Sequence, residues 1–363
     1  MNAQKVQNAE MPVWTNIKPV LLKEVVDEYV IGNEKTKKIL STAIYNHYKR
    51  LSYHSQNGQS GVEIEKSNIL LIGGTGSGKT YLVKTICKLL NVPYYIGDAS
   101  TMTASGYVGA DAQSILTGLY MAAGEDLAKA QHGICIIDEI DKIANKEQNA
   151  TVQRDVNGQD VQYELLKMME GTVMKIQPKE KSYHEGKTFI NFDTTNVLFI
   201  CMGAFEGIEK IIEKRLNIRK IGFRDVDEKK KYDANKVFSY VNQDDIRAMG
   251  LIRELIGRLH IIVSTDILSK ETLKDILTKP KNSIVKQYQE LFKMDGWTLE
   301  FEDDALDEIA GYSIKNKSGA RSLRTTIEKI LQDDMFETPL SLDRERHLTI
   351  TAEMVREKLE IDD

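Results

Sequence analysis

A glycine-rich octapeptide between an apolar run and a helical pattern constrains the fold of this chain more than any other feature. The stretch GGTGSGKT (73–80) follows NILLI (68–72) and precedes TYLVKTICKLL (80–90), whose apolar residues recur at helical spacing. A buried strand, a glycine-rich loop and a helix, in this order, are the context in which G-x-x-x-x-G-K-[ST] binds phosphate. The same order begins a strand–helix–strand unit and therefore favours a parallel sheet.

We expect this loop to hold the phosphates of ATP. Its glycines let consecutive backbone N–H groups curl around the β-phosphate, and the start of the helix adds its positive dipole end. Lys79 can reach the β- and γ-phosphate oxygens, and Thr80 offers a hydroxyl to Mg²⁺. A chance glycine-rich turn is the alternative, and the flanking strand and helix argue against it. The predicted nucleotide-binding residues of the loop are Gly73, Gly74, Thr75, Gly76, Ser77, Gly78, Lys79 and Thr80.

A second apolar run, in ICIIDEIDK (134–142), ends in acidic residues. Asp138 is suited to hold Mg²⁺ through water, and Glu139 can polarise an attacking water as general base. Solvated acids at a strand end are the alternative interpretation, but the upstream phosphate loop favours the catalytic one. We interpret Asp141 as an acid at the start of a helix.

Strand and helix patterns alternate over most of the chain. Buried strands are predicted in GICII (133–137), NVLFIC (196–201) and LHIIVS (259–264), and two helices joined by a turn are predicted within residues 21–51. This alternation predicts an α/β fold with a doubly wound parallel sheet.

After Thr265 the sequence pattern changes from alternating strands and helices to mainly helices. We predict a large α/β domain over residues 17–265 and a smaller, mainly helical C-terminal α+β domain over residues 271–361, with a short β segment at HLTIT (347–351). Residues 1–16 are polar and predicted to be disordered.

The composition indicates the cellular compartment of the protein and narrows the classes of binding partner. The chain has 363 residues, 41% hydrophobic and 28% charged, which is typical of a soluble globular protein. Its net charge of −5 does not indicate broad binding to nucleic acid or to anionic membranes. Cys87, Cys135 and Cys201 each lie in an apolar run and predict buried, reduced thiols, which suits the cytoplasm. Because there is no Cys-x-x-Cys pair and no histidine ligand spacing, we expect no zinc site.

Two further expectations concern membranes and export. The N-terminal stretch MNAQKVQNAEMPVW has no apolar core, so it does not resemble a secretory signal. The apolar runs are all too short to span a membrane.

Several separated motifs together resemble the AAA+ ATPases and, within them, the ClpX family. The resemblance extends from about Ile17 to Leu340. Besides the two nucleotide motifs it rests on YVIGNEKTKK (29–38), RDVNGQDVQYELLKMMEGT (154–172), ELIGRL (254–259) and SGARSLR (318–324). The related HslU unfoldases carry a large insertion in the ATPase domain, for which this chain has no room.

The resemblance implies nucleotide-site roles that spacing alone does not derive. Val30 and Ile31 would line the adenine pocket. Arg258 would be an arginine finger that acts on the ATP of a neighbouring subunit, which requires a ring, here a homohexamer. Arg321 would contact the γ-phosphate as the sensor 2 residue. Without the resemblance, both arginines would be interpreted as surface residues.

The stretch SGYVGAD (105–111) resembles the first pore loop of the family, and residues 154–172 resemble the second. An aromatic side chain between glycines can press on any polypeptide by contact area alone. A turn with Tyr107 flat on the surface is the alternative. The residues implied to contact substrate in the pore are Gly106, Tyr107, Val108, Gly109 and Arg154.

The stretch KIGFR (220–224) places an apolar tripeptide in a polar segment. By resemblance, Ile221, Gly222 and Phe223 would dock into a cleft of a ClpP-type peptidase ring. A tripeptide that packs under its own domain is the alternative.

The chain departs from the family pattern in four places. The four cysteines of the zinc domain with which the family usually begins are not found in this sequence, as expected of either a naturally short or a trimmed form, which leaves adaptor docking through that domain open. Ser182-Tyr183-His184 stands where the family has Arg-Lys-His at the channel entrance, so tag preference is expected to differ. Arg253 replaces a usual proline, and Met202-Gly203 follows NVLFIC without a polar sensor 1 residue.

The resemblance implies an ATPase that unfolds tagged or unfolded proteins and threads them into a ClpP-type peptidase, with no nucleic acid or membrane partner. A stand-alone remodelling chaperone is one alternative. A nucleic-acid motor is another, but it needs a basic channel, whereas the pore segments here contain Asp111, Asp155 and Asp160. A purely structural nucleotide-binding protein would be indifferent to Glu139→Gln.

Overall fold

The computed structural model describes residues 18–57, 62–103, 110–111, 113–144, 156–178, 189–218, 234–340 and 346–360. Residues 1–16, predicted to be disordered, lie outside this set. Contacts within the chain divide it into two compact units. The first comprises Met1–Leu22, Lys35–Gly73 and Lys79–Thr265, and the second comprises Lys23–Glu34, Gly74–Gly78 and Asp266–Asp363. The tip of the glycine-rich loop therefore groups with the C-terminal part of the chain.

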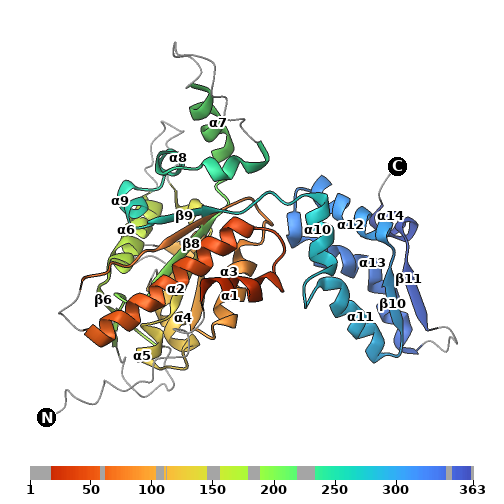
Figure 1. The fold of residues 1–363 in the computed structure, drawn as a ribbon, viewed down its shortest axis with the longest axis horizontal. Helices are drawn as coiled ribbons and strands as arrows, with labels where there is room; N and C mark the ends of the chain where they lie inside the picture. The colour runs from red at the N-terminus through yellow and green to blue at the C-terminus, as the bar shows by residue number, and fades with distance from the viewer. Residues whose placement is uncertain are drawn as a thin grey trace. The chain divides into compact units, whose positions relative to one another are not determined.

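A five-stranded parallel sheet organises the first unit (Figure 1). Its strands are β1 (Ile69–Ile72), β2 (Tyr94–Asp98), β5 (Ile134–Asp138), β8 (Leu198–Gly203) and β9 (Ile261–Ser264). The spatial order is β2-β5-β8-β1-β9, and every pair is parallel. The predicted α/β fold is thus confirmed. Because the strands run parallel, their carboxyl ends meet at one edge, where open α/β sheets bind ligands.

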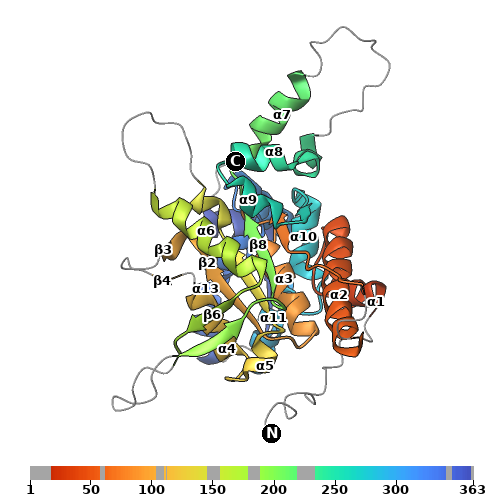
Figure 2. The ribbon, with the colours of Figure 1, turned by 90° about the vertical axis from the view of Figure 1, so that its left-hand side faces the viewer.

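Helices cover both faces of this sheet. Figure 2 shows α2 (Glu34–Asn57) and α3 (Lys79–Leu89) on one side and α6 (Val156–Glu170) on the other. On the α6 side, Leu70, Cys135 and Phe199 pack into one core cluster with Leu165 of α6. Since neither face meets water, β1 is buried at every residue instead of alternating.

Shorter elements complete the first unit. They are α4 (Ser114–Ala122), α5 (Leu127–Ala130), α7 (Ile208–Ile218), α8 (Gln243–Ala248), α9 (Arg253–Gly257), the parallel pair β3 (Met102–Thr103) and β4 (Ala110–Asp111), and the antiparallel pair β6 (Val173–Ile176) and β7 (Ile190–Asp193). The three cysteines are free and buried, as predicted. Burial raises the pKa of the Cys87 thiol to about 12, so the thiol stays protonated and unreactive.

The second unit is mainly helical, with its own core. Its elements include α10 (Lys270–Thr278), α11 (Ile284–Met294), β10 (Thr298–Phe301), α12 (Asp303–Lys315), α13 (Leu323–Glu337), β11 (His347–Ile350) and α14 (Ala352–Leu359), and α1 (Pro19–Asp27) ends within it. Leu273, Phe292, Ile309 and Ile327 are buried in a single cluster. Within the described residues, none of the helices is long and apolar enough to cross a membrane.

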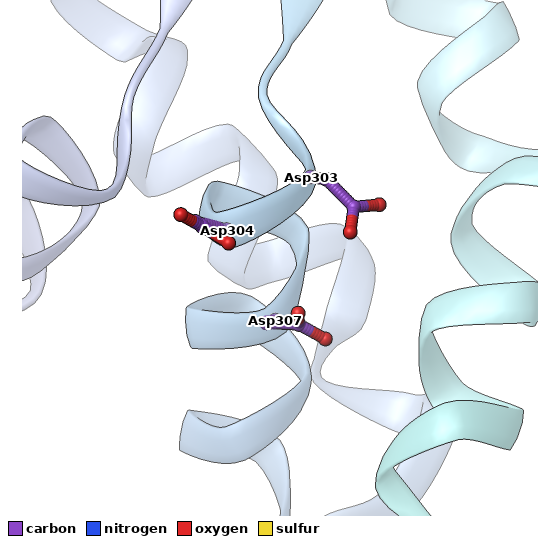
Figure 3. A group of neighbouring side chains, drawn as sticks. All are labelled: Asp303, Asp304 and Asp307. Atoms are coloured by element: carbon purple, nitrogen blue, oxygen red, sulfur yellow. The ribbon is translucent and has the colours of Figure 1, made fainter.

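Three carboxylates gather at the start of α12 (Figure 3). Their oxygens, from Asp303, Asp304 and Asp307, lie within 4.8 Å of one another. The ammonium group of Lys274 lies 2.7 Å from Asp303 and 2.9 Å from Asp307. Acids are also favoured at a helix N-terminus. The cluster is therefore explained by the helix dipole and the lysine.

Basic side chains converge at the amino end of the sheet in the first unit. His47 of α2 is buried, and Lys66, which precedes β1, donates to the carbonyl of Thr194 at 3.0 Å. Burial, together with the charges of Arg50, Lys66 and His132, holds the pKa of His47 well below its usual value. The folded protein therefore keeps His47 neutral.

Acid is expected to destabilise the fold through His47. Unfolded histidine titrates near pH 6.5, so below that pH the unfolded state binds a proton that folded His47 does not. Stability should fall by up to about 1.4 kcal/mol per pH unit from this residue as pH drops from about 6.5 toward 5. Urea unfolding midpoints of wild type and His47→Gln at pH 7.5 and 5.5 measure the difference. The exposed His347→Gln is the control, and an equal acid response in all three proteins would contradict the assignment.

Candidate nucleotide-binding site

The glycine-rich loop follows β1 directly, and α3 begins at its lysine. Lys79 is almost fully buried, and its Nζ donates to the carbonyl of Gly73 at 2.5 Å. A buried ammonium group needs acceptors, and a phosphate oxygen is a stronger acceptor than a carbonyl. The lysine is thus held at the base of the loop, in a place suited to a phosphate.

The sheet brings Thr80 and Asp138 together although 58 positions separate them. The Thr80 hydroxyl donates to Oδ2 of Asp138 at 2.8 Å. Thr80 follows β1, Asp138 ends β5, and β8 lies between the two strands. A hydroxyl and a carboxylate at this distance are the hard oxygen ligands that Mg²⁺ prefers, so the pair fits a magnesium–nucleotide site.

Glu139 adopts a left-handed backbone conformation immediately after the strand, with φ of 55°. Its backbone N–H donates to Oδ1 of Asp138 at 3.0 Å. This conformation costs a non-glycine residue about 1–2 kcal/mol, and such strain is concentrated at functional sites. The bend moves the chain from β5 into the 3-10 segment Ile140–Ile143 within one residue.

Asp141 lies in the first turn of this segment, and its Oδ1 accepts a hydrogen bond from the backbone N–H of Ala204 at 3.1 Å. Ala204 follows β8, where the sequence showed no polar sensor 1 residue. The Asp141 carboxylate thus joins the turn after β5 to the end of β8, a contact that the sequence did not reveal.

In the second unit, two distant segments hold the tip of the glycine-rich loop. The backbone N–H of Ala320 donates to the carbonyl of Gly76 at 2.9 Å, and Nδ2 of Asn33 donates to the carbonyl of Ser77 at 3.3 Å. In a trans peptide the N–H and the C=O point in opposite directions. The N–H group of the same peptide as each of these two carbonyls therefore points away from the residue, Ala320 or Asn33, that binds the carbonyl. The contacts therefore orient the peptide planes of the loop.

Two glycines make this approach possible, and we call the contact between them the glycine clasp (Gly76, Gly319 and the Ala320–Gly76 hydrogen bond). Both have positive φ, 74° for Gly76 and 57° for Gly319. A Cβ on Gly76 would lie 2.1 Å from the carbonyl oxygen of Ser318, and a Cβ on Gly319 would lie 2.9 Å from the carbonyl oxygen of Gly76. Only glycine fits at either position without backbone movement.

The glycine clasp brings the predicted sensor 2 arginine beside the loop. Arg321 ends the 3-10 segment Gly319–Arg321 and is exposed. Val30 is buried and Ile31 half-buried in the segment that leads to Asn33. Oδ1 of Asn33 also accepts from the backbone N–H of Asp266 at 2.7 Å, so this one amide joins the loop tip to the start of the C-terminal segment.

Arg258 lies in the first unit, directly after α9. Its side chain is about half exposed, and Nη2 lies 2.7 Å from Oε1 of Glu170. Its backbone carbonyl accepts from Nδ2 of Asn68 at 3.2 Å, which fixes the end of α9 against the start of β1. The partner Glu170 was not identified from the sequence.

The predicted pore and docking residues lie outside the described residues. They are Gly106, Tyr107, Val108, Gly109, Arg154, Ile221, Gly222 and Phe223, and the Ser182-Tyr183-His184 triplet lies outside them too. The short strands β3 and β4 pair with each other on either side of the first of these stretches. The pore and docking assignments stay predictions.

Comparison with protein families identifies two matching models. Residues 64–262 match the AAA domain (Cdc48 subfamily), and residues 268–352 match the C-terminal, D2-small domain of ClpB protein. The first match contains the glycine-rich loop, Asp138, Glu139 and Arg258, and the second contains Arg321.

Curated relatives are similar over nearly the whole chain, and three of them are named ATP-dependent Clp protease ATP-binding subunit ClpX. The protein from Porphyromonas gingivalis is 44% identical over 346 residues, which are 95% of this chain and 83% of the relative. The one from Bacteroides thetaiotaomicron is 45% identical, covering 96% of this chain and 82% of the relative. The one from Treponema denticola is 46% identical, covering 93% and 81%.

Proposed function

Because the chain belongs to the ClpX family of AAA+ ATPases, as its motifs predicted, we propose that it is an ATP-driven unfoldase and translocase that works as a homohexameric ring. One observation carries the proposal: the Thr80–Asp138 pair lies at the carboxyl edge of the sheet, with Glu139 held in a strained conformation beside it. The pair fits Mg²⁺, and the bend after β5 places Glu139 next to it, where a general base is needed.

In this proposal each residue of the site has its own role in binding or hydrolysing ATP. Lys79 would hold the β- and γ-phosphates, and Thr80 and Asp138 would hold Mg²⁺. Mg²⁺, when bound, neutralises charge on the transferring phosphoryl group. Glu139 takes a proton from the attacking water, which makes the water a better nucleophile.

The two arginines extend the proposal from one subunit to a ring. Arg258 stabilises charge on the γ-phosphate of a neighbouring subunit, which is why a ring of subunits is required. Arg321, which lies in the segment that the glycine clasp holds at the loop tip, contacts the γ-phosphate. Val30 and Ile31 contact the adenine base.

Substrate handling and partners follow from the family. We propose that Tyr107 and its neighbours pull tagged or unfolded proteins through the pore, and that Ile221, Gly222 and Phe223 dock on a ClpP-type peptidase. The relatives are named as a subunit of a Clp protease, which supports this partnership. The buried free thiols suit the cytoplasm. Nucleic acid and membranes are not proposed as partners.

Unfolding of a tagged fluorescent protein tests the proposal. Tyr107→Ala should slow ATP-dependent unfolding about tenfold while ATP hydrolysis continues, because a pore aromatic contributes contact area to the substrate and nothing to the nucleotide. Adding a ClpP-type peptidase should convert unfolding into degradation. Phe336→Ala is the control, since Phe336 is an exposed aromatic residue of α13 (84%) with no assigned contact to substrate. Equal unfolding rates in both variants would contradict the assignment of Tyr107 to the pore.

A further inference from the structure

One glutamine of α6 holds the segment that leads into α9, the helix directly before Arg258. Gln162 is fully buried. Its Oε1 accepts from the backbone N–H of Ile252 at 2.8 Å, and its Nε2 donates to the carbonyl of Ile143 at 2.8 Å and lies 3.4 Å from that of Gly250. One buried amide therefore joins α6 to the turn after Glu139 and to the residues just before α9.

The last residue of α6 holds the other end of α9. Oε1 of Glu170 accepts from Nη2 of Arg258 at 2.7 Å and from Nε at 3.2 Å. Both donors belong to one edge of the guanidinium plane, so Nη1 on the opposite side takes no part in this pairing. The carboxylate thus orients the arginine and leaves part of its donor set available.

Core packing joins the two helices between these contacts. Leu255 and Ile256 of α9 are buried in the same cluster as Val161 and Leu165 of α6. The segment that carries Arg258 is therefore held before the helix, along it and after it by side chains of one neighbouring helix.

We propose that Glu170 is a positioning residue for Arg258 and that Gln162 fixes the segment from which Arg258 projects, so that α6 sets the direction of the finger. This inference rests on the proposed action of Arg258 on a neighbouring subunit. Both partners of the ion pair are more than one-third exposed (48% and 39%), and such a pair contributes little to folding stability. Its effect is to restrict the rotamers of a long side chain before the transition state forms.

A double-mutant cycle tests the proposal on the assembled ring. Glu170→Gln should lower kcat for ATP about tenfold and leave the KM for ATP and the melting temperature unchanged, because a finger acts on the transition state and not on nucleotide binding. In an Arg258→Ala background, Glu170→Gln should have no further effect, since a positioning residue acts only through the residue it positions.

The control is another Arg–Glu pair of similar exposure. Nε of Arg356 lies 3.1 Å from Oε1 of Glu308 in the second unit, so Glu308→Gln removes a comparable charge away from Arg258 and should leave kcat unchanged. Additive losses in the double mutant, or a higher kcat in Glu170→Gln, would overturn the positioning role. If Arg258→Ala itself leaves kcat unchanged, the finger assignment fails instead, and the two failures are thereby distinguished.

Discussion

Replacing Glu139 with glutamine is expected to lower kcat for ATP about 100-fold or more while ATP binding is retained, because a positioned general base contributes 10²–10⁴-fold and an amide cannot accept the proton. Glutamine has the same length and leaves the backbone N–H of residue 139 free to bond Asp138, as it does at 3.0 Å in the wild type. Single-turnover hydrolysis and fluorescent-nucleotide binding measure the two quantities separately.

Glu125→Gln is a matched control for this substitution. Glu125 also adopts a left-handed backbone, with φ of 63°, and it is exposed after α4. The Glu125→Gln variant should hydrolyse ATP at the wild-type rate. This outcome would exclude backbone strain at a substituted glutamate as the cause of the lower kcat in Glu139→Gln. Unchanged hydrolysis in Glu139→Gln would reject the general base and return the chain to the class of structural nucleotide-binding proteins.

Replacing Gly319 with valine is expected to weaken the apparent affinity for ATP roughly 30-fold. A β-branched residue at φ of 57° is strained, and its Cβ would lie 2.9 Å from the carbonyl oxygen of Gly76. Strain together with the lost Ala320–Gly76 hydrogen bond corresponds to about 2 kcal/mol, which is roughly 30-fold in a binding constant. Nucleotide titration gives the binding constant, and steady-state kinetics give the KM for ATP. Gly319→Ala should show a smaller loss, since alanine tolerates the left-handed conformation better.

Gly124→Val is the control that distinguishes the effect of backbone strain from the effect of losing the glycine clasp. Gly124 has φ of 70°, and a Cβ there meets no atom within 4 Å. This variant should lose stability but keep wild-type affinity for ATP. If Gly319→Val lowers only the melting temperature and binds ATP normally, the glycine clasp serves local folding and does not set the nucleotide loop.

The elements predicted from sequence were those with continuous apolar runs or clear helical periodicity. The strands at 68–72, 133–137, 196–201 and 259–264 are all present, because a strand covered on both faces must be apolar throughout. The edge strand β2, with sequence YYIGD, was missed because Tyr95 and Asp98 are exposed and it contains no such run. The hairpin β6–β7 was missed for the same reason, since Val173 and Lys175 face solvent.

Loop motifs were predictable where chemistry restricts the residue types. GGTGSGKT, Asp138 and Glu139 could be identified because only a few residue types, at fixed spacings, can bind phosphate and Mg²⁺. The residues that hold the loop tip and the Arg258 segment in place could not be identified in this way. Gln162, Glu170 and Asn33 belong to residue types common on any surface, and only their burial or contacts distinguish them.

By itself the sequence determined the family, the parallel α/β sheet and the phosphate loop, because apolar periodicity and glycine spacing are local properties of the chain. The tertiary structure alone decided which distant residues meet. It joined Thr80 to Asp138 across the sheet, Gly319 to Gly76 in the glycine clasp and Glu170 to Arg258 beside α9. The reason is physical: a hydrogen bond or a steric contact depends on distances of a few ångströms between atoms, and packing, not spacing along the chain, sets those distances.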